Sequence, residues 1–449
     1  AVRLLSLAVL AVLAGRAVAQ SGAITEQRVR ETVQWLAADE RQGRDTPSKG
    51  LDEAAEWLAA RFAAAGLQQV VEESWFHGYT VPATKMDPLA VTASLNWRDG
   101  SDNRKLELVP GEQVRLWRAG ETVTADGDAC TVAKADDPAL QRMLNARSAR
   151  QTVFLEVPKD HPYWTLADGE RVTLGARRAA AKPVFLVKEG VLPKLPAKAP
   201  QFTADWTAKA AETIDQPLRN VVALLPGTDL KDEYVVVSAH YDHVGIQQPI
   251  GGDAVYNGAD DDATGTTAVV LIAEALAKSA TPLRRSVLFV CFSAEEKGLL
   301  GSKAFADNPP VPRDRIVCNI NLEMLGRPMP GNEGKAWITG VGYSNFADAV
   351  RPAMARAGVG LVDFQMSNML FGASDNFSFV RHGIVAHSIS AGSLHDDYHK
   401  PSDEVGKLDI PHMTKVIAGL REAVVDLAGR DGRLEWNEDG KKAIESRRR

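Results

Sequence analysis

The stretch SVLFVCFSAEE, residues 286–296, is a continuous apolar run that ends in two adjacent carboxylates, Glu295 and Glu296. A strand that is apolar on both faces is typical of a parallel sheet covered by helices on both sides. Two carboxylates at the end of a buried strand repel each other and lose solvation, so a nearby positive charge or a bound proton is expected. The stretch therefore predicts a strand of a buried sheet with a charged site at its end.

Further runs of this kind begin at Asn220 and are separated by helix-like stretches. The apolar runs are NVVALL (220–225), EYVVVSA (233–239), IVCNINL (316–322) and GIVAHSI (383–389). The helix-like stretches are TGTTAVVLIAEALAK (264–278), SNFADAVRPAMARAG (344–358) and HMTKVIAGLREAVVDLA (412–428). This alternation predicts an α/β fold with a mostly parallel central sheet sandwiched by helices.

The rest of the chain divides by its sequence texture. A chain of 449 residues is too long for one compact core, so two domains are expected. Residues 20–75 contain two helical patterns, and we assign them with residues 216–430 to one domain. Residues 76–215 contain short alternating runs broken by Pro and Gly, which predict an inserted β-rich domain. Residues 431–449 are expected to form a charged tail.

The N-terminal residues 1–19 have the pattern of a secretory signal peptide. Arg3 is followed by an apolar core at residues 4–15 and by Ala17-Val18-Ala19, so cleavage is expected after Ala19. A membrane span is the alternative, but the core is much shorter than the roughly 20 residues that a span needs. The pattern predicts a secreted or periplasmic protein without a stable membrane span.

The overall composition excludes some partners. The formal net charge is −6, and no long basic run precedes Arg447–Arg449, so nucleic acid is not an expected partner. The three cysteines, Cys130, Cys291 and Cys318, are too few and too scattered for a disulfide framework. We expect all three to be buried small apolar groups. The sequence leaves the oligomeric state open.

Polar residues follow the predicted strands. EYVVVSA leads into His240-Tyr241-Asp242-His243, SVLFVCF into Glu295-Glu296, and IVCNINL into Glu323. The segment NGADDDATG (257–265) places three aspartates before a helix, and DYHKPSD (397–403) places His399 after the last apolar run. Ligands of open α/β sheets gather at the carboxyl ends of the strands. These acidic and imidazole side chains are therefore expected to meet at one edge.

The spacing of these residues indicates metal chemistry. His240 and Asp242 would point to the same side of a strand, where a carboxylate can orient a metal-bound imidazole. A solvated loop is the alternative. A single aspartate before a helix is a common cap, whereas the three at 260–262 favour a cation or a bridging carboxylate.

The Glu295-Glu296 pair can divide two tasks. One carboxylate can bind a metal while the other takes a proton from water. This division relieves the repulsion between the two adjacent negative charges. An exposed turn is the alternative. His395 and His387 are alternative ligands to His399, but His387 lies inside an apolar run and is expected to be a hydrogen-bonded core histidine.

Taken together, the motifs resemble one family. HYDHVG (240–245), NGADDDATGTTAVV (257–270), SAEEKGLLGS (293–302), NLEMLGR (321–327), ASDNFSF (373–379) and DYHKPSDE (397–404) occur in that order. They are similar to the M28-type co-catalytic, di-zinc metallo-aminopeptidases, which include secreted bacterial aminopeptidases, glutamate carboxypeptidase II and glutaminyl cyclase. The resemblance covers about residues 22–70 and 216–430, which would then be the catalytic metallopeptidase domain. The insert occupies the place where many members carry a protease-associated domain.

The resemblance implies a site with two divalent metal ions, zinc being the first candidate. The implied ligands are His240 and Glu323 for one ion, Glu296 and His399 for the other, and Asp261 as the bridge. The implied catalytic residues are Glu295 as general base, Asp242 as the group that orients His240, and Tyr398 as a support for the oxyanion. Asp375 falls on a family Ser-Asp motif near the site.

Glu323 departs from the family pattern, which has Asp at this position. Glutamate is also a carboxylate ligand, but it is one methylene longer, so the geometry at the first metal is expected to differ. The remaining ligand set contains imidazole and carboxylate without thiolate, which suits zinc and also fits manganese or cobalt.

The leading hypothesis is an exported metallo-aminopeptidase, a hydrolase that acts on a peptide or small protein with a free N-terminus. A carboxypeptidase or dipeptidase is an alternative and would need a basic residue for the substrate carboxylate. Arg327 and Arg381 are candidates, although we expect them to be salt-bridge partners. Glutaminyl cyclase is less favoured because the two-metal set is complete. A non-catalytic receptor on the same fold is disfavoured because buried carboxylates are costly without metal.

Overall fold

The computed structural model describes residues 22–120, 122–134, 151–175, 182–192, 201–392 and 394–448. The predicted signal peptide, residues 1–19, lies outside this range. The chain forms two compact units, one from the segments that end at Tyr79 and begin again at Leu218, the other from Thr80–Pro217. Within the described segments, no helix combines the length and apolar character needed to cross a membrane.

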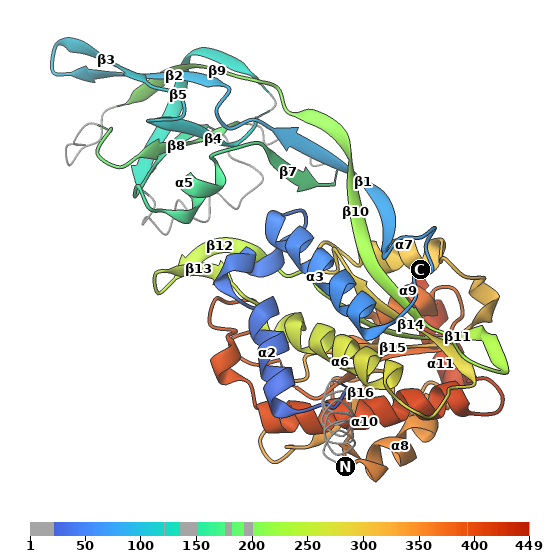
Figure 1. The fold of residues 1–449 in the computed structure, drawn as a ribbon. Helices are drawn as coiled ribbons and strands as arrows, with labels where there is room; N and C mark the ends of the chain where they lie inside the picture. The colour runs from blue at the N-terminus through green and yellow to red at the C-terminus, as the bar shows by residue number, and fades with distance from the viewer. Residues whose placement is uncertain are drawn as a thin grey trace, which may run out of the picture. The chain divides into compact units, whose positions relative to one another are not determined.

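The first unit contains a central sheet and most of the helices (Figure 1). Its strands are β10 (Glu212–Leu225, which begins in the second unit), β11 (Leu230–His240), β12 (Gly245–Ile250), β13 (Asp253–Tyr256), β14 (Arg285–Phe292), β15 (Ile316–Glu323), β16 (Lys335–Ile338), β17 (Gly360–Leu361) and β18 (Ala386–Ser390). Its helices are α2 (Glu26–Leu36), α3 (Lys49–Ala65), α6 (Gly265–Ala277), α7 (Leu300–Asp307), α8 (Phe346–Arg356), α9 (Asn376–Val380), α10 (Ile410–Gly429) and α11 (Glu438–Arg448). Short 3-10 or π turns are η1 (Asp39–Arg44), η2 (Ala259–Thr264), η3 (Arg313–Arg315), η4 (Leu370–Gly372) and η5 (Val405–Lys407).

The central sheet is parallel where its strands are most buried. Seven of the nine strands of this sheet are named above, in the order β17-β16-β18-β15-β11-β14-β10. The four middle strands β14, β11, β15 and β18 are mutually parallel, while β10 and β16 pair with them antiparallel. Every residue of β14 is buried, as the continuous apolar run predicts. The predicted α/β fold with a mostly parallel central sheet is confirmed.

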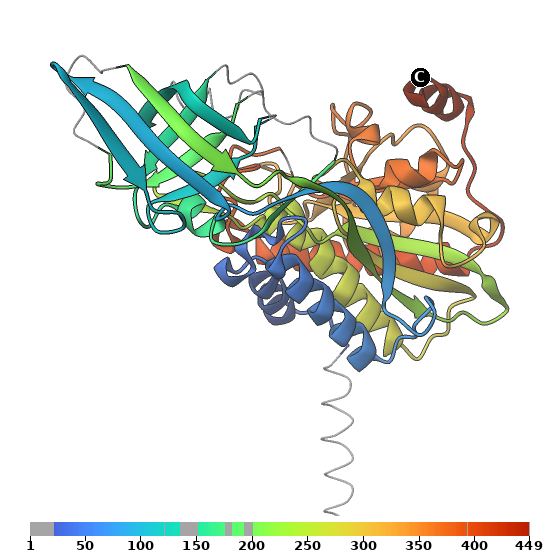
Figure 2. The same cartoon turned by 90° about the horizontal axis from the view of Figure 1, so that it is seen from above.

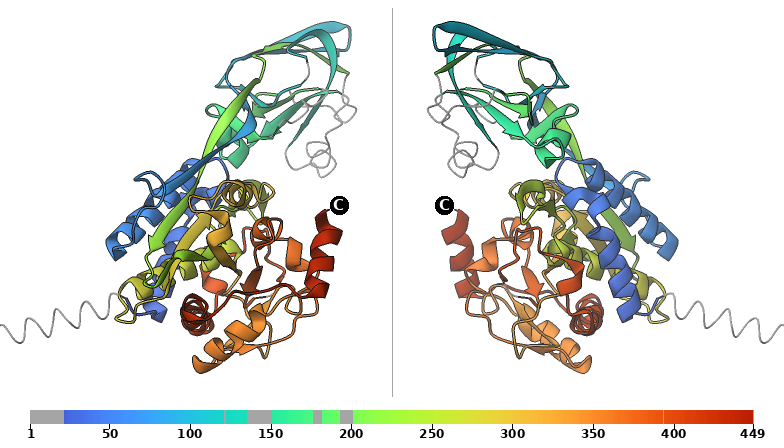
Figure 3. Two further views of the ribbon diagram at one scale, coloured as in Figure 1. Left: turned by 90° about the vertical axis from the view of Figure 1, so that its right-hand side faces the viewer. Right: turned by 90° about the vertical axis from the view of Figure 1, so that its left-hand side faces the viewer.

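The alternation of side chains along each strand builds two cores. Val235 and Val237 of β11 join a core with α2, α3, α6, α8 and α10, whereas Val236 joins a core with α7, α9 and α11. Figures 2 and 3 show α2, α3 and α6 on one side of the sheet and α11, in dark red, on the other. Burying one such side chain contributes roughly 1.5–3 kcal/mol, so the two layers hold the strand ends firmly in place.

Local signals fix the helices that support the sheet. Ser48 accepts a hydrogen bond from the amide of Leu51 at 3.1 Å and begins α3, and Gly66, with φ of 87°, ends it. Asp409 caps α10 through the amide of His412 at 2.9 Å. Residues 431–449, expected to form a charged tail, include α11, whose Ile444 is buried in the second core.

The second unit is rich in strands. Its seven-stranded sheet has the order β3-β2-β9-β5-β6-β8-β4. Its elements are β1 (Phe76–Met86, which begins in the first unit), β2 (Val91–Asp99), β3 (Asp102–Leu108), β4 (Val114–Arg118), β5 (Thr124–Lys134), β6 (Thr152–Val157), α5 (Pro162–Leu166), β7 (Arg171–Leu174), β8 (Val184–Lys188) and β9 (Phe202–Ala208). Cys291 and Cys318 are buried, as expected, but Cys130 on β5 is only half-buried, although it packs against the core of this unit. The assignment of residues 76–215 to an inserted β-rich domain stays a prediction.

Candidate metal centre

The candidate site lies at one edge of the central sheet. Strand β11 ends at His240, β14 at Phe292 and β15 at Glu323, and β11 pairs in parallel with both of the others (Figure 1). Their carboxyl ends therefore meet at the same edge, where α/β sheets bind ligands. The loops that follow the strands carry the other polar residues predicted from the sequence.

Three side chains form the strand-end cluster, which we define as His240, Asp261 and Glu323. His240 Nε2 lies 3.3 Å from Asp261 Oδ1 and 3.3 Å from Glu323 Oε1. The side chain of His240 is 1% exposed and that of Asp261 is 4% exposed. One imidazole and two carboxylates thus offer ligand atoms to a common point from two strand ends and one loop.

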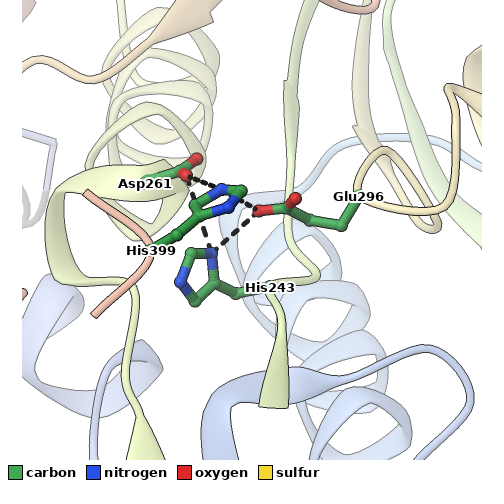
Figure 4. A group of neighbouring side chains, drawn as sticks. All are labelled: His243, Asp261, Glu296 and His399. Carbon is green, nitrogen blue, oxygen red and sulfur yellow. Dashed lines mark hydrogen bonds and ion pairs between the residues drawn. The ribbon is translucent and has the colours of Figure 1, made fainter. Parts of the chain in front are cut away.

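Four side chains form the loop cluster, which we define as His243, Asp261, Glu296 and His399 (Figure 4). His399 Nε2 lies 3.0 Å from Asp261 Oδ2 and 3.1 Å from Glu296 Oε1. His243 Nδ1 lies 3.0 Å from Glu296 Oε1 and 3.7 Å from Asp261 Oδ2. The ligand atoms of all four lie within 4.8 Å of one another. Asp261 belongs to both clusters and offers one oxygen to each.

The three successive aspartates have different partners. Asp261 faces the clusters, whereas Asp260 Oδ1 accepts from the amide of Gly326 at 2.7 Å. Asp262 Oδ1 accepts from the amides of Gly265 at 3.0 Å and Met324 at 3.1 Å. The outer aspartates therefore tie η2 to the residues that follow β15. This arrangement places Asp261 between the strand ends.

Asp242 contacts His240 less directly than the sequence pattern suggests. His240 Nδ1 lies 3.1 Å from the backbone carbonyl of Asp242 and 3.7 Å from its carboxylate. The carboxylate instead accepts from the amide of Glu295 at 3.1 Å and from Thr46 Oγ1 at 3.2 Å. Asp242 thus fixes both the ring of His240 and the backbone of Glu295, because its two polar groups point in different directions.

Glu323 is oriented by hydrogen bonds from two neighbours. Ser374 Oγ donates to Glu323 Oε2 at 2.6 Å, and Asn321 Nδ2 donates to the same oxygen at 3.2 Å. These contacts leave Oε1 directed toward His240. A metal ligand is usually oriented by hydrogen bonds of this kind.

The electrostatics of the centre favour positive charge between the carboxylates. Burial alone would raise the pKa of Glu296, but the imidazoles of His243 and His399 outweigh burial and lower it to about 2. Burial alone would lower the pKa of His399, but the carboxylates of Asp261 and Glu296 raise it to about 10. Burial raises the pKa of Glu295 well above its ordinary value, against the opposing effect of His240. Glu295 and Glu296 therefore differ sharply in proton affinity.

The residues present fit divalent metal ions. Among the described residues, six aspartates are almost fully buried: Asp242, Asp260, Asp261, Asp262, Asp375 and Asp403. Buried carboxylates are costly unless positive charge or hydrogen bonds compensate them. The buried guanidinium of Arg44 supplies one charge near Asp242 and Asp261. Within the described segments, Glu296 Oε1 and both ring nitrogens of His243 lack a hydrogen-bond partner although they are buried. Imidazole and carboxylate donors in two clusters match the ligand preferences of zinc.

Two further predicted residues lie beside the centre. The ring of Tyr398 stacks on that of His399 at a centroid distance of 3.9 Å, and burial raises the pKa of its hydroxyl, so the hydroxyl stays protonated. Asp375 is fully buried at the start of α9, and burial raises its pKa to about 7. A pocket of about 90 Å³ opens next to Glu323 and Tyr398 and is lined by apolar residues that include Met324, Trp337 and Leu394.

The structure brings the five predicted ligands together, and it adds one residue that the sequence reasoning missed. The sequence analysis named His243 only as a polar residue after a strand. In a continuing strand, positions 240 and 243 would face opposite sides. The strand ends at His240, so His243 turns into the loop cluster. The second histidine in HYDH was the available signal. Of the alternative ligands, His387 is hydrogen-bonded to Thr339 and Ser344, and His395 contacts Asp260.

Comparisons with known proteins agree with this fold. A model of peptidase family M28 matches residues 220–424. Aminopeptidase YwaD of Bacillus subtilis is 26% identical over 230 residues, which cover 49% of this chain and 47% of the relative. Leucine aminopeptidase 1 of Ajellomyces capsulatus (strain H88) is 30% identical over 222 residues, which cover 45% of this chain and 54% of the relative. The chain thus spans about half the length of the curated relatives it matches.

Solved structures extend the likeness to most of the chain. BSAP, a zinc aminopeptidase from Bacillus subtilis, is 17% identical with a TM-score of 0.55, covering 91% of this chain and 97% of that one. An aminopeptidase from Aneurinibacillus sp. strain AM-1 is 18% identical with a TM-score of 0.50, covering 92% and 96%. The fold is therefore that of these solved structures, and two clusters of candidate metal ligands lie at the edge of its sheet. Residues 220–424 are similar to peptidase family M28, the family whose model they match.

Proposed function

We propose that the chain is a metallo-aminopeptidase that hydrolyses the N-terminal peptide bond of a peptide or small protein. The observation that carries the proposal is the pair of ligand clusters that share Asp261, with the carboxylate of Glu295 beside them. Zinc is the first candidate for both ions because the donors are imidazoles and carboxylates without thiolate. When bound, two such ions would lower the pKa of a water between them and polarise the scissile carbonyl.

Glu295 is the proposed general base. Its raised pKa suits a group that accepts a proton from the attacking water and then delivers it to the leaving amine. The hydrogen bond from its amide to Asp242 fixes the start of the Glu295-Glu296 turn. Glu296 keeps a low pKa and stays ionised as a ligand. The two adjacent carboxylates thus take different roles because their surroundings separate their proton affinities.

Tyr398 and the neighbouring pocket are the proposed substrate contacts. The protonated hydroxyl of Tyr398 can donate a hydrogen bond to the oxyanion that develops at the scissile carbonyl. The apolar lining from Met324, Trp337 and Leu394 suits an apolar side chain on the N-terminal residue of the substrate. The acidic surroundings of the centre suit the free α-ammonium group of that residue.

Export is part of the proposal. It is supported by the signal-peptide pattern of residues 1–19, with cleavage after Ala19, which would place the enzyme in the periplasm or the medium.

The proposal is tested by hydrolysis of unblocked and N-acetylated aminoacyl anilides, with and without a chelator. The wild-type chain should cleave only the unblocked substrate, and chelation should abolish cleavage. Glu295→Gln should keep its bound metal and lose about 10²–10⁴-fold in turnover, because general-base catalysis contributes about that much. Equal cleavage of both substrates would overturn the aminopeptidase assignment, and normal turnover of Glu295→Gln would exclude this residue as the base.

A further inference from the structure

His243 is a buried histidine without the hydrogen bonds that buried histidines need. Its side chain is 0% exposed, and within the described segments neither Nδ1 nor Nε2 has a hydrogen-bond partner. Leaving a buried polar group unpaired costs about 1–3 kcal/mol, so native structures rarely do it. The polar contacts of the ring are the ion-pair contacts of Nδ1 with the carboxylates of Glu296 and Asp261, which a bound cation would strengthen.

The position of Nδ1 identifies the kind of partner. Nδ1 lies 3.0 Å from Glu296 Oε1, yet no hydrogen bond of normal geometry joins the two atoms, which meet only as an ion pair. Two ligand atoms bound to one tetrahedral zinc at about 2.0–2.1 Å lie about 3.3 Å apart. The observed distances are close to this value. Glu296 Oε1 lies 3.0 Å from His243 and 3.1 Å from His399, and Asp261 Oδ2 lies 3.7 Å and 3.0 Å from the same two rings.

The surrounding backbone is shaped to hold the ring. The amide of His243 donates to the carbonyl of Arg44 at 3.2 Å. Gly258, with φ of +58°, lies directly against the imidazole, and a Cβ at this position would come within 2.4 Å of His243 Cγ. Only glycine therefore leaves room for the ring where it points at Glu296 (Figure 4). The histidine is fixed in place by the fold and does not reach the cluster by chance.

We propose that His243 binds metal through Nδ1 and is the fourth protein ligand of the ion held by Asp261, Glu296 and His399. The inference rests on the two-metal centre of the proposed function. It makes the two halves of the centre unequal, because the loop cluster then offers four protein ligands and the strand-end cluster three. Four protein ligands close a tetrahedral zinc site, whereas three leave a position open.

The asymmetry assigns different tasks to the two halves. The open position belongs to the strand-end cluster, next to the pocket that Glu323 helps to line. With four protein ligands the loop cluster would be the tighter site, and a water between the two ions would be a fifth ligand there.

The test measures metal binding by the full chain and does not depend on peptidase activity. The metal-free wild type, His243→Leu, His240→Leu and the double variant are titrated with Zn²⁺ against a chromophoric chelator, and with Co²⁺ followed by visible absorption. Wild type should bind two ions. Each single variant should weaken one ion by at least about tenfold, and the double variant should weaken both, because each histidine serves a different ion. His243→Leu should also change the cobalt spectrum assigned to the four-ligand site.

Two results would distinguish failure of the proposed function from failure of the proposed role of His243. If wild type binds no ion, the proposed function fails, and this inference fails with it. If wild type and His243→Leu bind two ions with equal affinities and equal cobalt spectra, only this inference fails. His387→Leu, which removes a buried histidine outside the clusters, is the matched control. Circular dichroism checks folding, and His243→Gln, which keeps most of the side-chain volume, replaces the leucine variant if that variant does not fold.

Discussion

The two halves of the metal centre are positioned by different kinds of structure. In the strand-end cluster, His240 and Glu323 are the last residues of paired strands, so the hydrogen-bond ladder of the sheet sets their distance. In the loop cluster, His243, Glu296 and His399 all lie beyond strand ends. A ladder can place a ligand without further help, whereas a loop needs its own anchors because its backbone has no regular partner.

Buried polar anchors supply what the loops lack. Arg44 donates to the backbone carbonyls of Tyr241 at 2.8 Å, Asn257 at 2.9 Å and Gly258 at 3.1 Å, which joins the segments that carry His243 and Asp261. Asp403, four residues after His399, accepts from the amides of Asp260 at 3.1 Å and Asp261 at 3.2 Å. The loop half of the centre is therefore ordered by a buried charge network, and the strand-end half by the sheet.

The largest expected effect comes from removing the residue that both halves share. Asp261→Ala should weaken both ions, by more than the 10–100-fold typical of an outer-shell change, because each ion loses a direct ligand. Metal counting after dialysis should show less than one ion per chain, compared with two in wild type. Loss of one ion only would show that Asp261 does not bridge, and His240→Leu is the comparison that should lose one.

A smaller effect should separate the halves. Ser374→Ala removes the hydroxyl that donates to Glu323 Oε2 at 2.6 Å and leaves the loop cluster untouched. Zinc affinity should fall by about 10–100-fold at one ion and stay unchanged at the other. Competition titration measures both affinities. An equal loss at both ions would contradict the independence of the two halves, and Ser374→Thr, which keeps the hydroxyl, should restore most of the affinity.

The smallest expected effect concerns His387, a buried histidine whose two ring nitrogens are both hydrogen-bonded within the protein. His387 is as buried as His243, but its Nδ1 donates to the carbonyl of Thr339 at 2.7 Å and its Nε2 accepts from Ser344 at 2.7 Å. Burial lowers its pKa from 6.5 to about 4. The unfolded chain therefore binds the extra proton first, and stability is lost as the pH falls from 6.5 toward 4.

His387→Gln should remove this contribution without touching the metals. Between pH 7 and pH 5 the wild type should lose about 2 kcal/mol more stability than the variant, as linkage predicts for this shift. Denaturant unfolding at the two pH values measures the difference, and metal binding at pH 7 should match wild type. An identical pH dependence of the two proteins would show that His387 does not titrate as a buried neutral histidine.

The sequence predicts the strand-end part of the centre better than its loops. Continuous apolar runs located β11, β14 and β15, and parallel strands must end at one edge, so His240, Glu296 and Glu323 could be expected near each other. The segments with His399 and Asp261 were also expected at this edge, but the resemblance to a family was needed to single out these two residues. Two further features depend on contacts between segments far apart in the chain: the hydrogen bond from Ser374 to Glu323, and the turn that carries His243.

By itself, the sequence determined the α/β sheet, its helical layers and the kinds of donor at its edge, because apolar periodicity and strand ends are local properties of the chain. Only the tertiary structure decided which donors share an ion. In the tertiary structure, Asp260 and Asp262 accept hydrogen bonds from backbone amides, Asp261 lies in both ligand clusters, and His243 turns into the loop cluster beside Gly258. Those choices depend on the positions of buried side chains in three dimensions, to within a few tenths of an ångström, and no local pattern encodes them.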